Sequence, residues 1–382
     1  MSKKGPDIVL FLGAGFSKAA GLPVMSEFGT MSRQDFEKLQ EHAANPNSSK
    51  YREAAPMFVQ AAKMYYAFKN QCVISPTCSK EEANNLETVF CVAEVLYNSG
   101  IENITLDKKN IPVDLVLENI KLWLWKIYQQ CPLLNPYRKT DKETYDHLFC
   151  DLRKFAEQLI VLTTNYDLIF EYLSWKYEMP CVYPYNGFTE LSFGGTEKYI
   201  HDYDDNKGIV LCKLHGSVNY FDYPQSRDNE KIYISRTIGD IAKIGKSGRF
   251  KGNPALFAVD AIYEIRKQFG HKLVPALIPP TYAKLARKNW LRSMWKRAFL
   301  AFENASKIIF IGYSMPATDG FIRALINASF ARRHNQPDIF VIDKSDKVHE
   351  RYQILFKELY KGPKPMTLET ASEIGLSSLL EK

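Results

Sequence analysis

The sequence predicts an α/β fold in which helices cover both faces of a parallel sheet. Runs of four or five consecutive apolar residues recur along the 382-residue chain, and segments with helical periodicity separate them. A glycine or a polar residue follows each run. Strands that are apolar on both sides are typical of parallel sheets buried between two helical layers. The predicted architecture is therefore Rossmann-like.

The first predicted strand, Ile8–Leu12, leads into Gly13-Ala14-Gly15-Phe16-Ser17, the most informative stretch of the chain. Glycines allow the backbone to approach a pyrophosphate closely, and the start of the following helix adds partial positive charge. The same turn also serves plain packing of a strand against a helix. The prediction of nucleotide binding therefore depends on the residues that follow the other predicted strands.

Polar residues follow each of three further apolar runs. The runs and their continuations are Leu159–Leu162 with Thr163-Thr164-Asn165-Tyr166-Asp167, Ile308–Ile311 with Gly312-Tyr313-Ser314, and Ile339–Ile342 with Asp343. Open α/β sheets bind ligands at the carboxyl ends of their strands. We therefore expect one crevice to be lined by Ser17, Asn165, Ser314 and Asp343.

Residues 31–158 are helical in pattern and are expected to form an insertion in a domain made of residues 1–30 and 159–382. Its aromatic residues Trp123, Trp125 and Tyr128 suit either the core of the insertion or an assembly surface. Residues 185–270 alternate short strands with glycine-rich loops, which predicts a smaller irregular module. The polar chain from Lys361 onward is expected to be peripheral.

Composition narrows the class of protein. The seven cysteines are scattered and form no C-x-x-C pair, which argues against a disulfide framework and a structural zinc site. A reducing cytoplasm is therefore expected. No apolar stretch approaches the roughly 18 residues of a membrane span. The net charge of +7 favours an anionic ligand.

The densest basic segment, Lys284–Arg297, places Trp290 and Trp295 among arginines and lysines. It could grip the phosphate backbone of a nucleic acid. It also suits an amphipathic helix whose inward residues are Leu285, Leu291, Trp295 and Phe299. Helical spacing explains the pattern, so the second interpretation is favoured and nucleic-acid contact is the lesser alternative.

The ordered motifs resemble those of the sirtuin (silent information regulator) family of NAD-consuming enzymes. They are G-A-G-x-S-x-x-x-G-L-P from Gly13, T-x-N-x-D from Thr163, L-H-G-S from Leu214, and G-x-S from Gly312. The resemblance is closer to the sirtuin-like NAD hydrolases of bacterial antiviral defence. Leu277–Thr281 and Ile311–Pro316 are also similar to segments of those prokaryotic members.

The resemblance implies a role for each matched residue. Asn165 would orient the nicotinamide ribose or a water, Asp167 would contact the nicotinamide carboxamide, and His215 would act as general base. Taken without the other motifs, Asn165 and Asp167 are also typical of a helix N-cap, and Asp343 is also typical of a turn. NAD⁺ would be the substrate, with no zinc. The pyrophosphate would be cradled by Gly13, Ala14, Gly15 and Ser17, and the adenosine half lined by Gly312, Ser314 and Asp343.

The chain departs from sirtuin deacylases at several points. Val24-Met25-Ser26 follows Gly21-Leu22-Pro23, and Thr164 stands where glutamine is expected. The four-cysteine zinc ribbon and the usual peptide-pairing segment are absent from the sequence. What the resemblance then implies is an NAD⁺ glycohydrolase that forms nicotinamide and ADP-ribose and serves antiphage defence by NAD⁺ depletion.

Two other functions stay open on the sequence. One is a non-catalytic sensor of NAD or ADP-ribose that gates an oligomer, and the other is a zinc-free NAD-dependent protein deacylase. Control by assembly is expected, because constant NAD⁺ hydrolysis would poison the host. The expected assembly is a homo-oligomer, with a HerA-type ATPase/translocase or a short Argonaute-like protein as the separately encoded partner.

Overall fold

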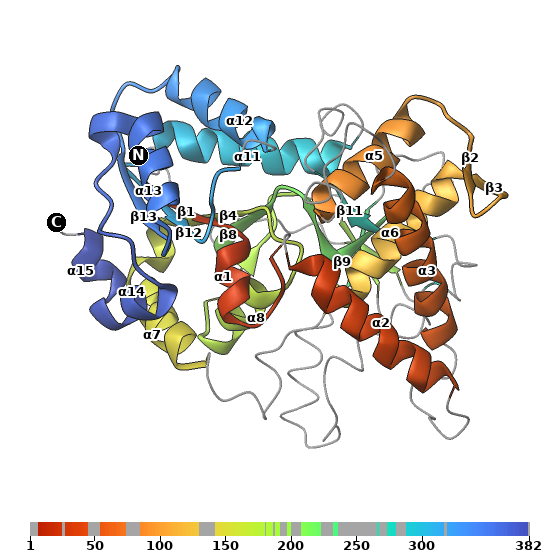
Figure 1. Ribbon diagram of the computed structural model, residues 1–382. Coiled ribbons are helices and arrows are strands. Elements are labelled where there is room, and N and C mark those ends of the chain that lie inside the picture. Colours follow the sequence, from red (N-terminus) through yellow and green to blue (C-terminus); the bar gives the residue numbers. More distant parts are fainter. Residues whose placement is uncertain are drawn as a thin grey trace.

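The computed structural model describes residues 7–24, 27–44, 54–73, 85–129, 142–179, 181–185, 188–191, 197–199, 208–222, 232–235, 266, 273–279, 288–316 and 319–380. Its centre is a six-stranded sheet of order β13-β12-β1-β4-β8-β5, in which every neighbouring pair is parallel (Figure 1). The strands are β1 (Ile8–Leu12), β4 (Leu159–Thr163), β5 (Cys181–Val182), β8 (Ile209–Lys213), β12 (Lys307–Ile311) and β13 (Asp338–Ile342).

The central strand β1 shows why these segments fold as strands. Successive side chains of a strand point to opposite faces of the sheet. Ile8, Leu10 and Leu12 accordingly belong to one hydrophobic cluster, while Val9 and Phe11 belong to another. Because both faces are buried, the strand tolerates no polar residue, and this produces the all-apolar run.

Helices cover both faces of the sheet, so the predicted α/β, Rossmann-like fold is confirmed. Phe16, Phe149 and Phe170 share the cluster of Leu10, whereas Trp295, Ile326 and Tyr352 share that of Phe11. The first face carries α1 (Ala14–Ala19), α7 (Lys142–Leu152), α8 (Ile169–Lys176), α14 (Leu368–Ile374) and α15 (Leu376–Leu380). The second carries α11 (Asn289–Asn304), α12 (Gly320–Phe330) and α13 (Asp346–Phe356). Two 3₁₀ helices span Arg153–Gln158 and Lys357–Leu359.

The chain after Lys361 is integral to the fold, so the expectation that it is peripheral is wrong. Its helices α14 and α15 pack against α7. Ala371 and Leu379 are buried, and the backbone and hydroxyl of Ser377 both donate to Asp151 at 2.7 Å. The segment is mostly polar in composition, so its few buried apolar residues give no clear signal in the sequence.

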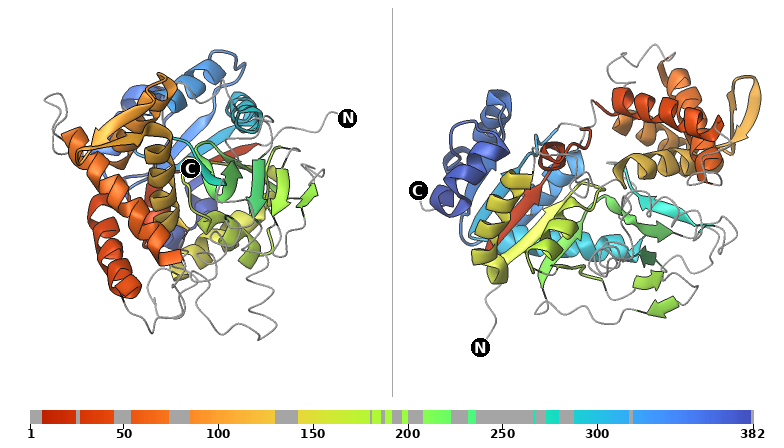
Figure 2. Two further views of the ribbon diagram at one scale, coloured as in Figure 1. Left: turned by 90° about the vertical axis from the view of Figure 1, so that its right-hand side faces the viewer. Right: turned by 90° about the horizontal axis from the view of Figure 1, so that it is seen from below.

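A helical lobe lies to one side of the main sheet (Figures 1 and 2). Trp123, Trp125 and Tyr128 of α6 are buried, which identifies them as core residues. Trp125 Nε1 donates to Val218 O at 2.6 Å and so ties the lobe to the smaller sheet. The lobe consists of α2 (Phe28–Ala44), α3 (Ala54–Val73), α5 (Leu86–Asn98), α6 (Val113–Tyr128) and the hairpin of β2 (Asn103–Leu106) and β3 (Lys109–Pro112). Helix α7, also within residues 31–158, packs instead against α8 and α14.

The second sheet has five strands in the order β11-β9-β10-β6-β7. They are β6 (Phe188–Leu191), β7 (Glu197–Tyr199), β9 (Gly216–Asp222), β10 (Ile232–Ser235) and β11 (Val274–Leu277). β8 falls within residues 185–270 but pairs with β4 in the main sheet, as its apolar run Ile209–Cys212 would have allowed us to predict. Parts of residues 185–270, such as 236–265, lie outside the described residues.

The basic segment Lys284–Arg297 contributes to α11, whose Trp290, Leu291 and Trp295 are buried. Trp295 Nε1 donates to Leu214 O at 3.0 Å. Leu291 and Trp295 therefore pack inward, as the amphipathic interpretation predicts, and Trp290, which that interpretation did not name, is buried as well. Leu285 lies outside the described residues. Within the described part of the chain, no helix has the length and apolar character to span a lipid bilayer.

The turn after β1 and the loop after β12 touch backbone to backbone. Gly13 N donates to Ile311 O at 3.0 Å, and Gly15 N donates to Gly312 O at 2.8 Å. A Cβ on Gly13 or Gly15 would lie 2.6 Å from backbone atoms of the loop. Gly312 has φ +60°, and its Cβ would lie 2.4 Å from Phe16 N. The glycines are thus required for close approach of two loops.

Replacing Gly312 with alanine is expected to lower the free energy of unfolding by about 2–4 kcal/mol, because left-handed strain adds to a backbone collision. Gly100→Ala is the matched control, since Gly100 has φ +75° but no atom within 4 Å of its added Cβ. That variant should lose only about 1 kcal/mol. Urea unfolding of both variants measures the difference, and equal losses would contradict the close-approach argument.

Candidate functional site

A cavity of about 720 Å³ opens at the carboxyl ends of the main-sheet strands. Its size is that of a small-molecule or cofactor site, for which about 300–1,000 Å³ is typical. The structure brings nine of the ten sequence-predicted residues to its wall: Ala14, Gly15, Ser17, Asn165, Asp167, His215, Gly312, Ser314 and Asp343. Gly13 is not among the lining residues and acts through its backbone, as described next.

The amides of the glycine turn are already engaged. Gly13 N, Gly15 N and Phe16 N donate to Ile311 O, Gly312 O and Gly13 O, respectively. Helix α1 is also short, with six residues. The turn therefore positions residues of the cavity wall, and the role of Gly13, Ala14, Gly15 and Ser17 in cradling a pyrophosphate stays a prediction.

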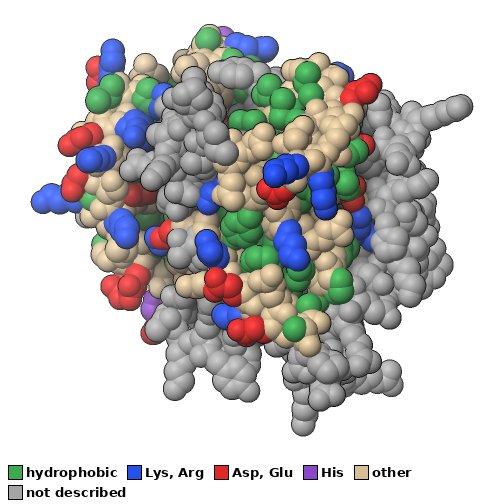
Figure 3. All heavy atoms as spheres, turned by 45° about the vertical axis from the view of Figure 1, so that its right-hand side comes forward, with side chains coloured by type: hydrophobic (Ala, Val, Ile, Leu, Met, Phe, Trp, Pro, Cys, Tyr) green, Lys and Arg blue, Asp and Glu red, His purple; other side chains and the backbone are tan. Residues whose placement is uncertain are grey.

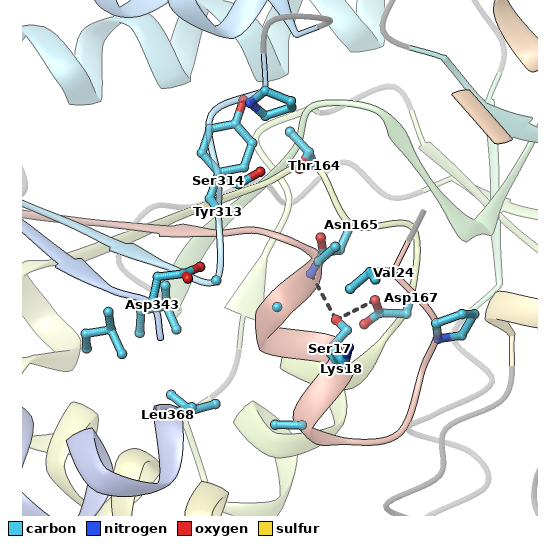
Figure 4. A pocket seen from close by; sticks show the side chains of 18 of the residues that line it. Ser17, Lys18, Val24, Thr164, Asn165, Asp167, Tyr313, Ser314, Asp343 and Leu368 are labelled. Atoms are coloured by element: carbon cyan, nitrogen blue, oxygen red, sulfur yellow. Dashed lines mark hydrogen bonds between the residues drawn. The ribbon is translucent and has the colours of Figure 1, made fainter. Parts of the chain in front are cut away.

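Asn165, Ser17 and Asp167 form one hydrogen-bonded group (Figure 4). Asn165 Nδ2 donates to Gly13 O at 2.8 Å and to Ser17 Oγ at 2.9 Å. Ser17 Oγ donates to Asp167 Oδ2 at 2.6 Å. Because Gly13 O can only accept, the Asn165 amide nitrogen must face it, and the side-chain oxygen Oδ1 is the atom left to bind a hydroxyl or water in the cavity.

Asp167 is 4% exposed, and both its carboxylate oxygens accept hydrogen bonds from the protein. Besides the Ser17 bond, Oδ1 accepts from Ile169 N at 3.0 Å at the start of α8. The helix-capping alternative for Asp167 is therefore realised. Each oxygen retains a second lone pair, so capping leaves Asp167 able to accept from a ligand.

A buried ion pair between Lys213 and Glu171, which the sequence did not predict, contacts the backbone of Asp167. Lys213 Nζ donates to Asp167 O and lies 3.2 Å from Glu171 Oε1. Glu171 also accepts from Tyr183 Oη at 2.9 Å. Burial raises the pKa of Glu171, and the Lys213 charge opposes that shift. Lys213 adjoins the L-H-G-S motif, but no sequence signal identified Glu171 as its partner.

His215 lies between β8 and β9 and is 3% exposed. Its backbone O accepts from Ile278 N at 2.9 Å. Gly216 follows with φ +80°, and an added Cβ there would collide with Ala276 O, so only glycine fits at this position. His215 Nε2 is 3.7 Å from Asp319 Oδ1. The imidazole therefore shares the cavity with Asn165, and Asp319 is a further wall residue that the sequence analysis did not identify.

The opposite end of the cavity combines two strand ends with the C-terminal segment. Asp343 Oδ1 accepts from Ser345 N at 2.9 Å, which is the turn geometry left open by the sequence. Asp343 O accepts from Met366 N at 2.9 Å. This bond brings Met366, Thr367 and Leu368 to the wall. No sequence pattern predicted these three residues at the cavity, because they reach it only when the C-terminal segment folds back against the end of β13.

The helical lobe also contributes to the wall, through Asn85 directly before α5 and Tyr128 at the end of α6. Tyr128 Oη donates to Pro23 O at 3.3 Å, and its ring lies 6.0 Å from that of Tyr166. Among the described residues, no group of three or more His, Cys, Asp or Glu side chains could hold a metal ion.

Lys213→Met should leave the Glu171 carboxylate buried without its cation and cost about 3–5 kcal/mol of unfolding free energy near neutral pH. The folded-state pKa of Glu171 is already raised above its ordinary 4.5 and should rise further. A folded state that binds the proton more tightly gains stability as pH falls toward 4.5. Urea unfolding across this range should show the variant recovering stability as pH falls. The double variant Lys213→Met/Glu171→Gln should lose that slope, and a slope retained there would contradict the assignment.

Comparisons with known proteins identify the family of the chain. The SIR2-like domain family matches residues 159–361, just over half of the chain. No curated protein matches the chain in sequence. One similar solved structure is Sir2 in complex with the inhibitor EX-527, 2'-O-acetyl-ADP-ribose and a deacetylated p53 peptide, at 12% identity and a TM-score of 0.31, with 96% of this chain and 90% of that chain covered. The chain belongs to the SIR2-like domain family.

Proposed function

We propose that this protein is an NAD⁺ glycohydrolase that converts NAD⁺ and water to nicotinamide and ADP-ribose. The observation that carries the proposal is that Asn165 and His215, which follow different strands, line one cavity at the carboxyl edge of the sheet. The family supports it, because the chain has a SIR2-like domain.

The chemistry suits these two side chains. The bond between the ribose C1′ and the nicotinamide nitrogen breaks, its electron pair leaves with neutral nicotinamide, and positive charge develops on the ribose. Asn165 Oδ1 accepts from a ribose hydroxyl or a water and holds it beside C1′. His215 takes the proton as the water oxygen bonds to C1′, and an imidazole is suited to this near neutral pH.

The charges of the wall fit the rest of the substrate. Lys18 and Lys344 line the cavity and offer positive charge to a pyrophosphate. Lys18 also pairs with Glu27, and this contact lowers the pKa of the Glu27 carboxyl. Asp343 can accept from the hydroxyls of the adenosine ribose, and Asp167 from the nicotinamide carboxamide.

We propose NAD⁺ depletion in bacterial antiviral defence as the biological output. This step rests on the resemblance of the ordered motifs. An enzyme that destroys a host cofactor must be silent until triggered, so activity is controlled by assembly, with a HerA-type ATPase/translocase or short Argonaute-like protein as the separately encoded partner.

Asn165→Ala and His215→Ala should each lower nicotinamide release from NAD⁺ by at least about 10²-fold, because each removes a group that acts on the reacting atoms. Chromatography of nicotinamide and ADP-ribose checks this, with purified protein alone and with the product of a neighbouring gene. His147→Ala is the matched control, since His147 is exposed on α7.

The same assay separates the alternatives. Equal release from both site variants and the parent would reject the assigned site. NAD⁺ binding by calorimetry with no nicotinamide release in any assembly would favour the non-catalytic sensor. Consumption of an acetyl-lysine peptide in step with NAD⁺ would favour the zinc-free deacylase.

We propose that the helical lobe carries the assembly surface and that its occupant is a second copy of the chain. Figure 3 shows hydrophobic side chains interspersed with Lys and Arg on the face turned toward the lobe side. On α5, Val92, Val95 and Tyr97 are 37%, 57% and 44% exposed, and Ile101, shortly after the end of this helix, is 44% exposed. Spacing of i and i+3 places the two valines on the same side of the helix.

Val95→Glu should weaken self-association at least about tenfold, because a charge would be buried in an apolar contact. Light scattering across a concentration series measures the mass of each variant. Ile354→Glu on α13 is the control, since Ile354 is 76% exposed outside the lobe and should tolerate the charge. Equal weakening of both variants, or of neither, would contradict this surface.

A further inference from the structure

Asp319 stands at the N-terminus of α12 yet does not cap that helix with its side chain. Aspartate at this position ordinarily accepts from an amide of the first turn. Here the residue is 3% exposed and lines the cavity. Burying a carboxylate is costly, so its contacts require another explanation.

Tyr313 sets the orientation of this carboxylate. Tyr313 Oη donates to Asp319 Oδ2 at 2.7 Å. Tyr313 is itself held by its ring, 4.5 Å from that of Phe11, and by its backbone O, which accepts from Tyr352 Oη at 2.9 Å. With Oδ2 bound to the tyrosine, Oδ1 is the oxygen that faces His215, 3.7 Å from Nε2.

We propose that Asp319 is the positioning carboxylate of His215. The inference rests on the proposed function and deepens it. A carboxylate beside Nε2 favours the tautomer with the proton on that nitrogen, so the lone pair, and with it the role of general base, lies on Nδ1. The negative charge also stabilises the imidazolium that forms when His215 takes a proton. Catalytic hydrogen bonds are often long before substrate binds, and the proposal requires the separation of 3.7 Å to shorten in the substrate complex.

The geometry makes the Asp319→Asn variant informative. Tyr313 Oη–H continues to donate, so it selects the carbonyl oxygen of the new amide and turns the amide nitrogen toward His215. An amide N–H needs an acceptor, and His215 Nε2 must then be unprotonated. The ring proton then resides on Nδ1, so this nitrogen no longer has a lone pair with which to accept a proton from water.

Nicotinamide release by Asp319→Asn should therefore fall by about 10²-fold or more in kcat with little change in KM. The second change in Tyr313→Phe/Asp319→Asn frees the amide to rotate and should restore part of kcat. Asp346→Asn, an exposed aspartate at the start of α13, is the control and should match the parent. A rise in KM alone, or a loss that the double variant does not relieve, would overturn the proposal.

Nitrogen NMR of ¹⁵N-histidine-labelled full-length protein tests the pairing without turnover. The His215 signals are assigned by their loss in His215→Gln, and spectra are taken at a pH where the ring is neutral. The proton should reside on Nε2 in the parent and on Nδ1 in Asp319→Asn. The same tautomer in both would overturn the inference. If the parent releases no nicotinamide, the proposed function fails, while these spectra still decide whether Asp319 orients His215.

Discussion

The backbone contact between the turn after β1 and the loop after β12 is the constraint on which the site depends. Three glycines allow it, because a Cβ on Gly13, Gly15 or Gly312 would lie 2.4–2.6 Å from the facing backbone. Ser17 follows the first of these segments and Asp319 the second, and both residues line one cavity. Gly13 O then anchors Asn165, so the same turn that joins the loops also orients the amide of the site.

The sheet and the position of the site were predictable because their signals are local. A strand buried on both faces reads as an apolar run, and a parallel sheet brings the following residues to one edge. This reasoning led from Ile8–Leu12 to Ser17 and from Ile339–Ile342 to Asp343, and the structure places both side chains on the same cavity. β8 has the same signal in Ile209–Cys212, but the glycine-rich segments along residues 185–270 favour an irregular module over a strand of the main sheet.

The parts that could not be predicted depend on contacts between distant segments. The sequence indicated that glycines follow β1, but the partner of their amides is the loop around Gly312, about 300 residues away in the chain. Glu171 and Lys213 carry no motif that pairs them, and their contact exists because α8 and β8 both adjoin Asp167. Leu368 reaches the cavity only through the fold-back of the C-terminal segment. Each case needs tertiary structure, which periodicity does not encode.

Helix α5 connects the cavity, where we propose that substrate binds, to the lobe surface, where we propose that a second copy of the chain binds. Its first turn follows Asn85 in the cavity wall, and its far end presents Val95 and Tyr97 at the surface. A helix moves largely as a rigid body, so a contact that repositions the exposed end also shifts the residue at the cavity. By reciprocity, a ligand that prefers one position of Asn85 favours the corresponding state of assembly. In the function that we propose, substrate binding and self-association would be linked through this one helix, as an enzyme controlled by assembly requires.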